Sequence, residues 1–182
     1  MKPLIAICGV SGSGKTSLVN KISKKYGYTV LKSYTTRKPR ENDDADLTSH
    51  EFCTLEEAQI IADNDEIVAS NWFDDNYYFA TKKQVDTSDL YVIDKKGLMN
   101  LYRNYHNKPI ISIFLDVDSS IAAERMSKRG DDDKAIMERL QHDSEVFEGI
   151  KDYVDFVCNN ETQERCNEIC EFIDMLMRYY NG

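Results

Sequence analysis

The residues best suited to chemistry lie near the N-terminus, at positions 9–16, where the sequence GVSGSGKT fits the pattern G-x-x-x-x-G-K-S/T in full. Glycines let successive backbone N–H groups turn toward one point and form a nest for an anion. A helix beginning behind the loop adds the positive end of its dipole. In such a loop Lys15 reaches the β- and γ-phosphates of a nucleotide, and the hydroxyl of Thr16 binds Mg²⁺. The pattern therefore predicts a site for a nucleoside triphosphate, which we expect to be ATP.

The residues predicted to bind ATP in this segment are Gly9, Ser11, Gly12, Ser13, Gly14, Lys15, Thr16 and Ser17.

A second basic group follows at positions 33–41, where Arg37 and Arg40 flank Pro39. Guanidinium groups grip phosphate with two parallel hydrogen bonds, and proline stiffens the turn that carries them. The plainer alternative is a solvated basic turn. The cluster stands out, however, because the chain as a whole is acidic, with a formal net charge of −9. We therefore expect it to hold the phosphate of an acceptor molecule.

The composition narrows the class of protein. An acidic chain is a poor partner for a long nucleic acid, whose binding usually needs a basic face. The five cysteines are odd in number and form no C-x-x-C pair, so neither a disulfide framework nor a zinc site is expected. We find no N-terminal signal segment and no apolar run long enough to span a bilayer. The expectation is a cytoplasmic protein that binds neither membrane nor long nucleic acid.

The elements that must position these residues are indicated by the hydrophobic pattern. A short apolar run before the glycine-rich loop and a helical pattern after it give the context that this motif needs. Strands alternating with helices predict an α/β fold, with a parallel sheet covered on both faces. Strands are expected at residues 4–8, 28–31, 90–93, 110–115 and 156–158, and helices at 15–25, 55–62, 97–105, 119–125, 136–150 and 161–179, with Ser119 as a cap.

The T-T-R-x-P-R stretch at positions 35–40, placed downstream of a G-x-S-G-S-G-K loop, resembles guanylate kinase. Later segments match motifs of that family in the same order. They are N-Y-Y at 76–78, I-D-x-x-G at 93–97, and an arginine in E-R-L at 138–140. The resemblance covers nearly the whole chain, and the joint order of the motifs is more specific than any one of them.

The resemblance implies a single domain, residues 1–182, built around a three-layer P-loop core with a parallel sheet. The core would comprise residues 1–32, 84–124 and 143–182. A small mixed-sheet insert that binds the nucleoside monophosphate would occupy residues 33–83. A helical lid would occupy residues 125–142, with Gly130 as its hinge.

The resemblance also implies roles for individual residues. Ser33, Arg37, Arg40 and Tyr78 would hold the acceptor phosphate, and Asp94 would lie beside Mg²⁺ and the acceptor. Asn160 would lie near the adenine of ATP. Three lid arginines would neutralise charge on the transferring group together with Lys15 and Arg37. They are Arg125, Arg129 and Arg139.

The match fails where the family reads guanine. A glutamate and a serine or threonine are expected at two positions that hold Ala69 and Ala80. On the phosphate side, if one residue has been inserted, His50 stands where the family has a tyrosine that touches the acceptor phosphate, and it is expected to bind the acceptor there. Phe79 replaces a glycine and is expected to add bulk close to the base, while Trp72 is expected either to stack on the base or to pack inside the insert.

Two readings follow from the missing carboxylate. Polar neighbours can take over the contact with the base, or the acceptor is not GMP. The neighbours considered are Ser70, Asn71, Asp74 and Thr81.

The function expected from these residues is transfer of the γ-phosphate of ATP to a nucleoside monophosphate, with GMP or dGMP ranked first and Mg²⁺ as cofactor. The acceptor phosphate has a second pKa of about 6, so no general base is needed. The alternatives are a kinase for another nucleoside or deoxynucleoside monophosphate, a non-catalytic protein-binding module of the same fold, and another P-loop enzyme. The protein is expected to be a monomer or a homodimer.

Overall fold

The structure is a computed structural model that describes residues 2–39 and 49–181. Its core is a parallel sheet of four strands in the order β6-β1-β7-β8. These strands are β1 (Leu4–Gly9), β6 (Leu90–Val92), β7 (Ile110–Asp116) and β8 (Phe156–Asn159). All pairs are parallel, so every strand ends at the same edge of the sheet. The loop that follows β1 therefore lies at the carboxyl edge, where α/β proteins usually bind their ligands.

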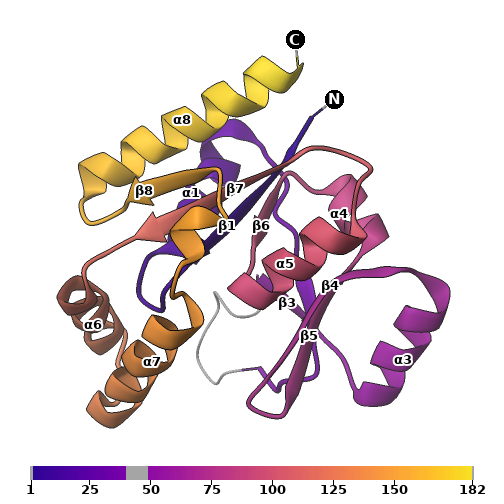
Figure 1. Ribbon diagram of the computed structural model, residues 1–182, viewed down its shortest axis with the longest axis horizontal. Coiled ribbons are helices and arrows are strands. Elements are labelled where there is room, and N and C mark those ends of the chain that lie inside the picture. The colour runs from indigo at the N-terminus through magenta and orange to yellow at the C-terminus, as the bar shows by residue number, and fades with distance from the viewer. Residues whose placement is uncertain (1, 40–48, 182) are drawn as a thin grey trace.

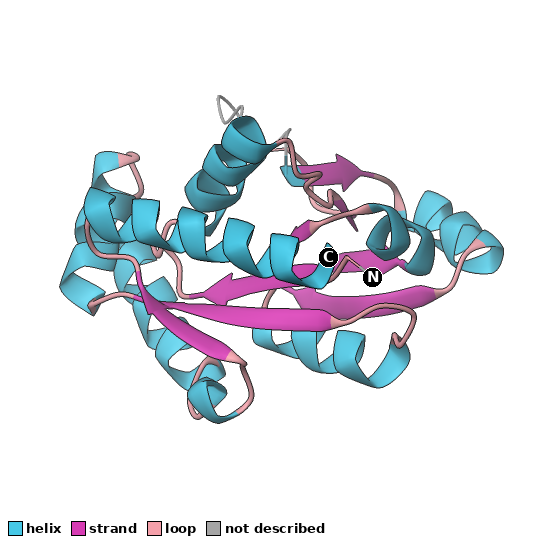
Figure 2. Ribbon diagram, turned by 90° about the horizontal axis from the view of Figure 1, so that it is seen from above, coloured by secondary structure: helices cyan, strands magenta, loops and turns pink. Residues whose placement is uncertain are grey.

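Helices cover both faces of the core sheet, as Figure 2 shows from above. Side chains of a strand alternate between faces. Ile5 and Ile7 of β1 pack with α1 (Lys15–Tyr26) and α8 (Gln163–Asn181), whereas Leu4, Ala6 and Cys8 pack with α5 (Lys95–Asn104). Because both faces are covered, β1 is apolar and buried along its whole length, as expected for a central parallel strand. The predicted three-layer α/β core is confirmed.

A second sheet lies beside the core and has the order β3-β2-β5-β4 (Figure 1). Its strands are β2 (Ser33–Thr35), β3 (His50–Phe52), β4 (Ile67–Phe73) and β5 (Asn76–Thr81). The β2–β3 pair is parallel and the other pairs are antiparallel, so the sheet is mixed, as predicted. Asp74 and Asp75 join β4 to β5 with φ of 49° and 57°, the backbone of a two-residue hairpin turn.

Short helices flank this sheet. The helix α3 (Leu55–Asn64) begins at a capping box in which Thr54 and Glu57 bond each other's backbone N–H, and α4 (Lys82–Thr87) leads from β5 back to the core.

Two further helices, α6 (Ser119–Lys128) and α7 (Asp133–Val146), pack against each other near the carboxyl edge of the core sheet. In Figure 1, α6 and α7 lie on one side of the end of β1, and the second sheet lies on the other side. A short 3₁₀ turn (Ile150–Asp152) connects α7 to β8. The loop after β1 is thus flanked by α6 and α7 on one side and by the mixed sheet on the other.

Three sequence-based expectations were wrong in detail. Residues 28–31 do not form a strand, because Val30 makes an isolated bridge to Leu90 and Thr29 bonds the side chain of Asp89. Asp118, not Ser119, caps α6 by accepting from the N–H of Ser120. The helix predicted to reach residue 150 ends at Val146, since Gly149 takes a left-handed conformation with φ of 68°.

None of the helices in the described part of the chain is both long enough and apolar enough to cross a bilayer.

Candidate active site

The loop between β1 and α1 is tightly packed against α6. At Gly12, where φ is 75°, an added Cβ would lie 2.4 Å from the carbonyl oxygen of Ala122. At Gly14, where φ is 90°, an added Cβ would lie 2.7 Å from Nδ2 of Asn160. Both positions demand glycine for conformation and for space. The spacing of the motif is therefore explained by a loop that must pass close to its neighbours.

Lys15 is folded back over this loop. Its ammonium donates to the carbonyl oxygens of Gly9 and Val10 at 2.7 and 2.8 Å, and lies 3.4 Å from Oγ of Ser13. Burial lowers the pKa of Lys15 to about 8, against the opposing effect of the nearby Asp143 carboxylate. Its charge is poorly solvated, so an incoming phosphate offers a stronger partner than the carbonyls do.

Asp143 of α7 also contacts the loop and was missed by sequence reasoning. One of its carboxylate oxygens accepts from the backbone N–H of Ser11 at 2.5 Å. Backbone N–H groups of this loop are the donors that a phosphate would use. No sequence motif marks Asp143, because it lies 132 residues from Ser11 along the chain.

Asn160 and Arg125 fix the loop from behind. The amide of Asn160 donates to the carbonyl of Ser13 at 2.7 Å, and its buried Oδ1 has no hydrogen-bond partner among the described residues. Arg125 donates to the carbonyl oxygens of Gly12, Asn160 and Glu161 at 3.3, 2.8 and 2.9 Å. Arg125 is thus bound to three backbone carbonyls. Thr16 and Ser17 begin α1, with Ser17 exposed.

The other two arginines predicted for the lid meet at one carboxylate. Arg129 donates to both oxygens of Asp131, at 3.1 and 2.5 Å, and Arg139 donates to Oδ2 of the same residue at 3.1 Å. Arg129 also lies close enough to Lys15 to lower its pKa. The structure therefore brings Arg129 and Arg139 together, with Arg129 within electrostatic reach of the loop lysine. Asp132, the residue after Asp131, caps the start of α7 by accepting from the N–H groups of Lys134 and Ala135.

On the second sheet, the residues predicted to hold the acceptor phosphate share one face. Arg37 donates through Nε to the hydroxyl of Tyr78 at 3.0 Å. Nδ1 of His50 lies 2.9 Å from the hydroxyl oxygen of Ser33, and the His50 ring meets that of Tyr78 edge-on, 5.8 Å between centroids. The guanidinium of Arg37 also lies 5.7 Å from the ring centre of Phe52. Four of the five predicted phosphate ligands are brought together; the fifth, Arg40, lies outside the described residues.

The strand register places two residues that were expected near the base. Tyr34, Phe79, Tyr77 and Trp72 stack in a continuous series, with centroids 5.1, 5.0 and 5.0 Å apart along it. Phe79 and Trp72 alternate with Tyr78 and Asn71 along their strands, so they lie on the opposite face from Tyr78. Phe79 therefore points away from the face that carries Tyr78, and Trp72, which is 54% exposed, stacks on Tyr77 on that opposite face.

Ala69 and Ala80 are paired across β4 and β5 and lie on the same face as Tyr78. They are fully buried and belong to the apolar core under α5. With methyl side chains, neither offers the hydrogen bond that the resemblance implies at these positions.

Asp94 ends up between the two sheets. Its Oδ1 caps α5 by accepting from the N–H of Gly97 at 2.6 Å, and its Oδ2 accepts from the side-chain amide of Asn71 at 2.9 Å. Its charge reaches Lys15 as well, since it raises the pKa of that lysine. Asp94 thus connects the phosphate loop with β4.

Thr16 and Asp94 fit a magnesium site in their chemistry. Mg²⁺ usually binds one or two protein oxygens together with phosphates and water. No group of three or more histidine, cysteine, aspartate or glutamate side chains in the described residues could hold a metal by itself. A metal here would accordingly depend on a nucleotide, with the hydroxyl of Thr16 and the carboxylate of Asp94 as the protein ligands.

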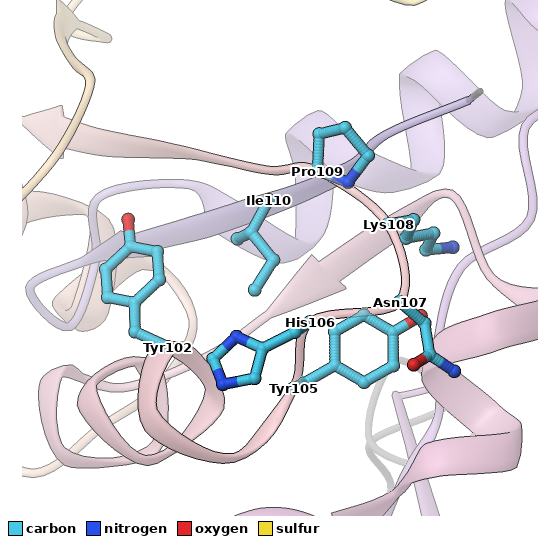
Figure 3. A pocket seen from close by; sticks show the side chains of 7 residues that line it. All are labelled: Tyr102, Tyr105, His106, Asn107, Lys108, Pro109 and Ile110. Atoms are coloured by element: carbon cyan, nitrogen blue, oxygen red, sulfur yellow. The ribbon is translucent and has the colours of Figure 1, made fainter.

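The surface hollows lie elsewhere. One of about 430 Å³ is lined by Tyr102 and by residues 105–110, including His106 and Lys108 (Figure 3), and one of about 320 Å³ lies next to it. Both lie where β1, β6 and β7 begin, at the amino edge of the core sheet. Ligands of α/β sheets bind at the opposite, carboxyl edge. His106 is exposed.

The chain is similar to known proteins over nearly all of its length. It is 25% identical to a guanylate kinase of Fusobacterium nucleatum over 94% of this chain and 95% of that protein. It is 28% identical to a guanylate kinase of Helicobacter pylori, covering 91% of this chain and 83% of that protein. The crystal structure of guanylate kinase from Anaplasma phagocytophilum matches 97% of this chain and 87% of that one, with a TM-score of 0.71 and 21% identity, which establishes the shared fold.

A family model described as "AAA domain" matches residues 5–148. The matched segment begins in β1 and continues through α7, so it contains the phosphate loop and both groups of arginines. The protein belongs to the AAA domain family, and the resemblance to guanylate kinases predicted from its motifs is confirmed.

Proposed function

We propose that this protein transfers the γ-phosphate of ATP to a nucleoside monophosphate, with GMP or dGMP as the acceptor. The observation that carries the proposal is the presence of two separate groups of residues suited to binding phosphate. One is the loop with Lys15 on the core sheet, and the other is the Arg37–Tyr78 pair on the second sheet. Phosphoryl transfer requires two phosphates held in line, with their charge stabilised, and little other chemistry from the protein.

The residues of the chain divide the work as follows. Backbone N–H groups of the loop and the ammonium of Lys15 bind the β- and γ-phosphates of the donor. Arg37 holds the acceptor phosphate, and Tyr78 orients Arg37 through its hydroxyl. Arg129 and Arg139 neutralise charge that spreads over the transferring group. Mg²⁺, when bound through Thr16 and Asp94, neutralises further charge on the phosphates.

The names of the relatives support GMP as the acceptor, since the proteins from Fusobacterium and Helicobacter are guanylate kinases. Ala69 and Ala80 stand against a simple transfer of that specificity, because neither can pair with guanine. We expect the protein to act in the cytoplasm as a monomer or homodimer, on small nucleotides.

Product analysis tests the proposal. ATP, Mg²⁺ and one monophosphate at a time are incubated with the protein, and ³¹P NMR follows the products. We expect ADP and a new nucleoside diphosphate in equal amounts, with Lys15→Ala reducing the rate by several orders of magnitude. ADP without a second diphosphate would indicate hydrolysis and reject the proposal. Binding of ATP without turnover on any monophosphate would favour a non-catalytic binding module.

A further inference from the structure

Position 69 of the proposed acceptor site carries no carboxylate, so another residue must read the base. Four polar neighbours were considered from the sequence, and the structure separates them. Ser70 pairs with Phe79 on the opposite face of the sheet, and Asp74 lies exposed in the hairpin turn. Thr81 is buried and caps α4, where its hydroxyl accepts from the N–H of Gln84. Asn71 remains, half-buried and paired with Tyr78 on the acceptor face.

The side chain of Asn71 has a fixed orientation. Asp94 Oδ2 lies 2.9 Å from Nδ2 of Asn71, and an ionised carboxylate only accepts hydrogen bonds. The NH₂ group of Asn71 must therefore point toward Asp94, which leaves Oδ1 as an acceptor. Among the described residues, Oδ1 of Asn71 has no hydrogen-bond partner.

The strand that carries Asn71 is fixed as well. From α5, Asn100 donates to the carbonyl of Ser70 at 2.8 Å and Asn104 to the carbonyl of Val68 at 3.5 Å. Residues four apart on a helix and two apart on a strand have similar spacing, so the two asparagines match the free edge of β4. Asp94 caps the same helix. One rigid element thus sets both partners of the Asn71–Asp94 hydrogen bond.

We propose that Asn71 is the residue that reads the acceptor base, and that Asp94 fixes its amide so that Oδ1 faces the base. The inference rests on the proposed function, because it assigns the specificity of that same acceptor site. Oδ1 of Asn71 and the remaining lone pairs of the Asp94 carboxylate supply acceptors at this point of the site. Guanine matches these acceptors, since its N1–H and N2–H₂ groups are adjacent donors. Adenine and cytosine present an acceptor next to their amino group, and uracil flanks its N–H with two carbonyls.

The position of Asn71 accounts for the alanines below it. Asn71 is two residues beyond Ala69 on the same face of β4. The polar contact is thereby moved along the strand, while Ala69 and Ala80 fill the apolar core under α5. A site built around a hydrogen bond to the base discriminates strongly against bases that leave its polar groups unpaired.

The test compares wild type with Asn71→Ala and the near-isosteric Asn71→Leu. Calorimetry measures the binding of GMP, AMP, CMP and UMP, and steady-state assays measure KM and kcat. We expect wild type to prefer GMP, and both variants to lose about tenfold to a hundredfold in GMP affinity while other monophosphates change little. KM for ATP should stay constant. Asn64→Ala, on exposed α3, removes an asparagine from the same region and should change nothing.

A second variant tests the role of Asp94 as a positioning residue. Asp94→Asn replaces a pure acceptor with a group that also donates, so the amide of Asn71 is free to turn over. We expect this variant to relax the preference between GMP and AMP rather than to weaken all acceptors equally.

The inference is overturned if wild type binds GMP no better than the other monophosphates, or if both Asn71 variants keep the wild-type preference. Failure of the proposed function is a different result, namely no diphosphate formed from any acceptor. Melting curves of the variants identify loss of fold, and a selectivity ratio that shifts in a folded variant reports base reading.

Discussion

The carboxylate of Asp143 accepts a hydrogen bond at 2.5 Å from the backbone N–H of Ser11, in the loop that we propose binds the phosphates of ATP. The preceding residue on α7, His142, contacts Phe73 near the tip of the β4–β5 hairpin, with 5.2 Å between ring centroids. Adjacent residues of α7 therefore contact both the phosphate loop and the second sheet. A triphosphate that uses the N–H of Ser11 competes with the Asp143 carboxylate for the same donor.

Asp143→Asn should therefore tighten ATP binding. Removing the charge weakens the competing hydrogen bond and its repulsion of phosphate, and a charge-assisted bond contributes about 1.5–3 kcal/mol. We expect the dissociation constant for ATP, measured by calorimetry, to fall by about tenfold. Glu145→Gln removes the same charge from an exposed position of the same helix and serves as the control. Unchanged or weaker ATP binding in Asp143→Asn would contradict the competition.

ATP affinity should depend on pH through Lys15, whose pKa is lowered to about 8 by burial. Phosphate favours the charged ammonium and raises this pKa in the complex, so binding of ATP above pH 8 requires uptake of a proton. Affinity should be nearly constant below pH 8 and should fall above it, by at most tenfold per pH unit. Calorimetry at pH 8.5 in buffers of different ionisation enthalpy measures the proton taken up. Release of a proton, or a pH-independent affinity up to pH 10, would be inconsistent with this assignment.

Tyr78→Phe should weaken the acceptor side alone. It removes the hydroxyl that accepts from Nε of Arg37, so Arg37 loses its orientation. We expect KM for GMP to rise about tenfold, the effect of one hydrogen bond to a charged group, while KM for ATP stays constant. Tyr77→Phe removes the same hydroxyl from the neighbouring residue on the opposite face. If Tyr77→Phe raised KM for GMP as much as Tyr78→Phe does, the bond between Tyr78 and Arg37 would not be the cause, and the prediction would be contradicted.

The lid arginines should divide into two kinds. Arg139→Ala and Arg129→Ala should lower kcat by about 10²–10³ with little change in nucleotide affinity, as expected when a charge-stabilising donor is removed. Arg125 holds the carbonyls of Gly12, Asn160 and Glu161, so Arg125→Ala should raise the dissociation constant for ATP and lower Tm. Single-turnover kinetics separates the two effects. A loss of kcat in Arg125→Ala with wild-type ATP binding and Tm would argue against this division.

Much of the fold could be predicted from local signals. The apolar run of β1, the glycine-rich loop and the helix behind it are contiguous in sequence, so their arrangement follows from neighbouring residues. The mixed second sheet was predicted from resemblance. It is confirmed, because one strand pair is parallel and the other two are antiparallel. The strand predicted at residues 28–31 does not form. A short apolar run does not reveal how far a neighbouring strand can pair with it, and here the pairing is limited to one bridge between Val30 and Leu90.

The faces of the second sheet could not be read from the sequence. The register of β4 against β5 shifts between Ile67 and Ala69, and a shift of one residue moves every side chain to the other face. The expectation for Phe79 came from its place between two motif positions, which does not reveal the face on which it lies, and Asn71 could not be separated from Ser70. Asp143 and Asp131 were also not identified as site residues, since their partners are set by how α7 packs near the phosphate loop.

The most direct test of the central claim is a competition among acceptors. The protein receives limiting ATP labelled at its γ-phosphate, together with equal amounts of GMP, AMP, CMP and UMP. Chromatography then measures the label in each diphosphate, which separates ADP made from AMP from the unlabelled ADP left by the donor. If the protein transfers phosphate from ATP to GMP, most of the label enters GDP, and Lys15→Ala abolishes the transfer. Label found in another diphosphate, or released as inorganic phosphate, would contradict this claim.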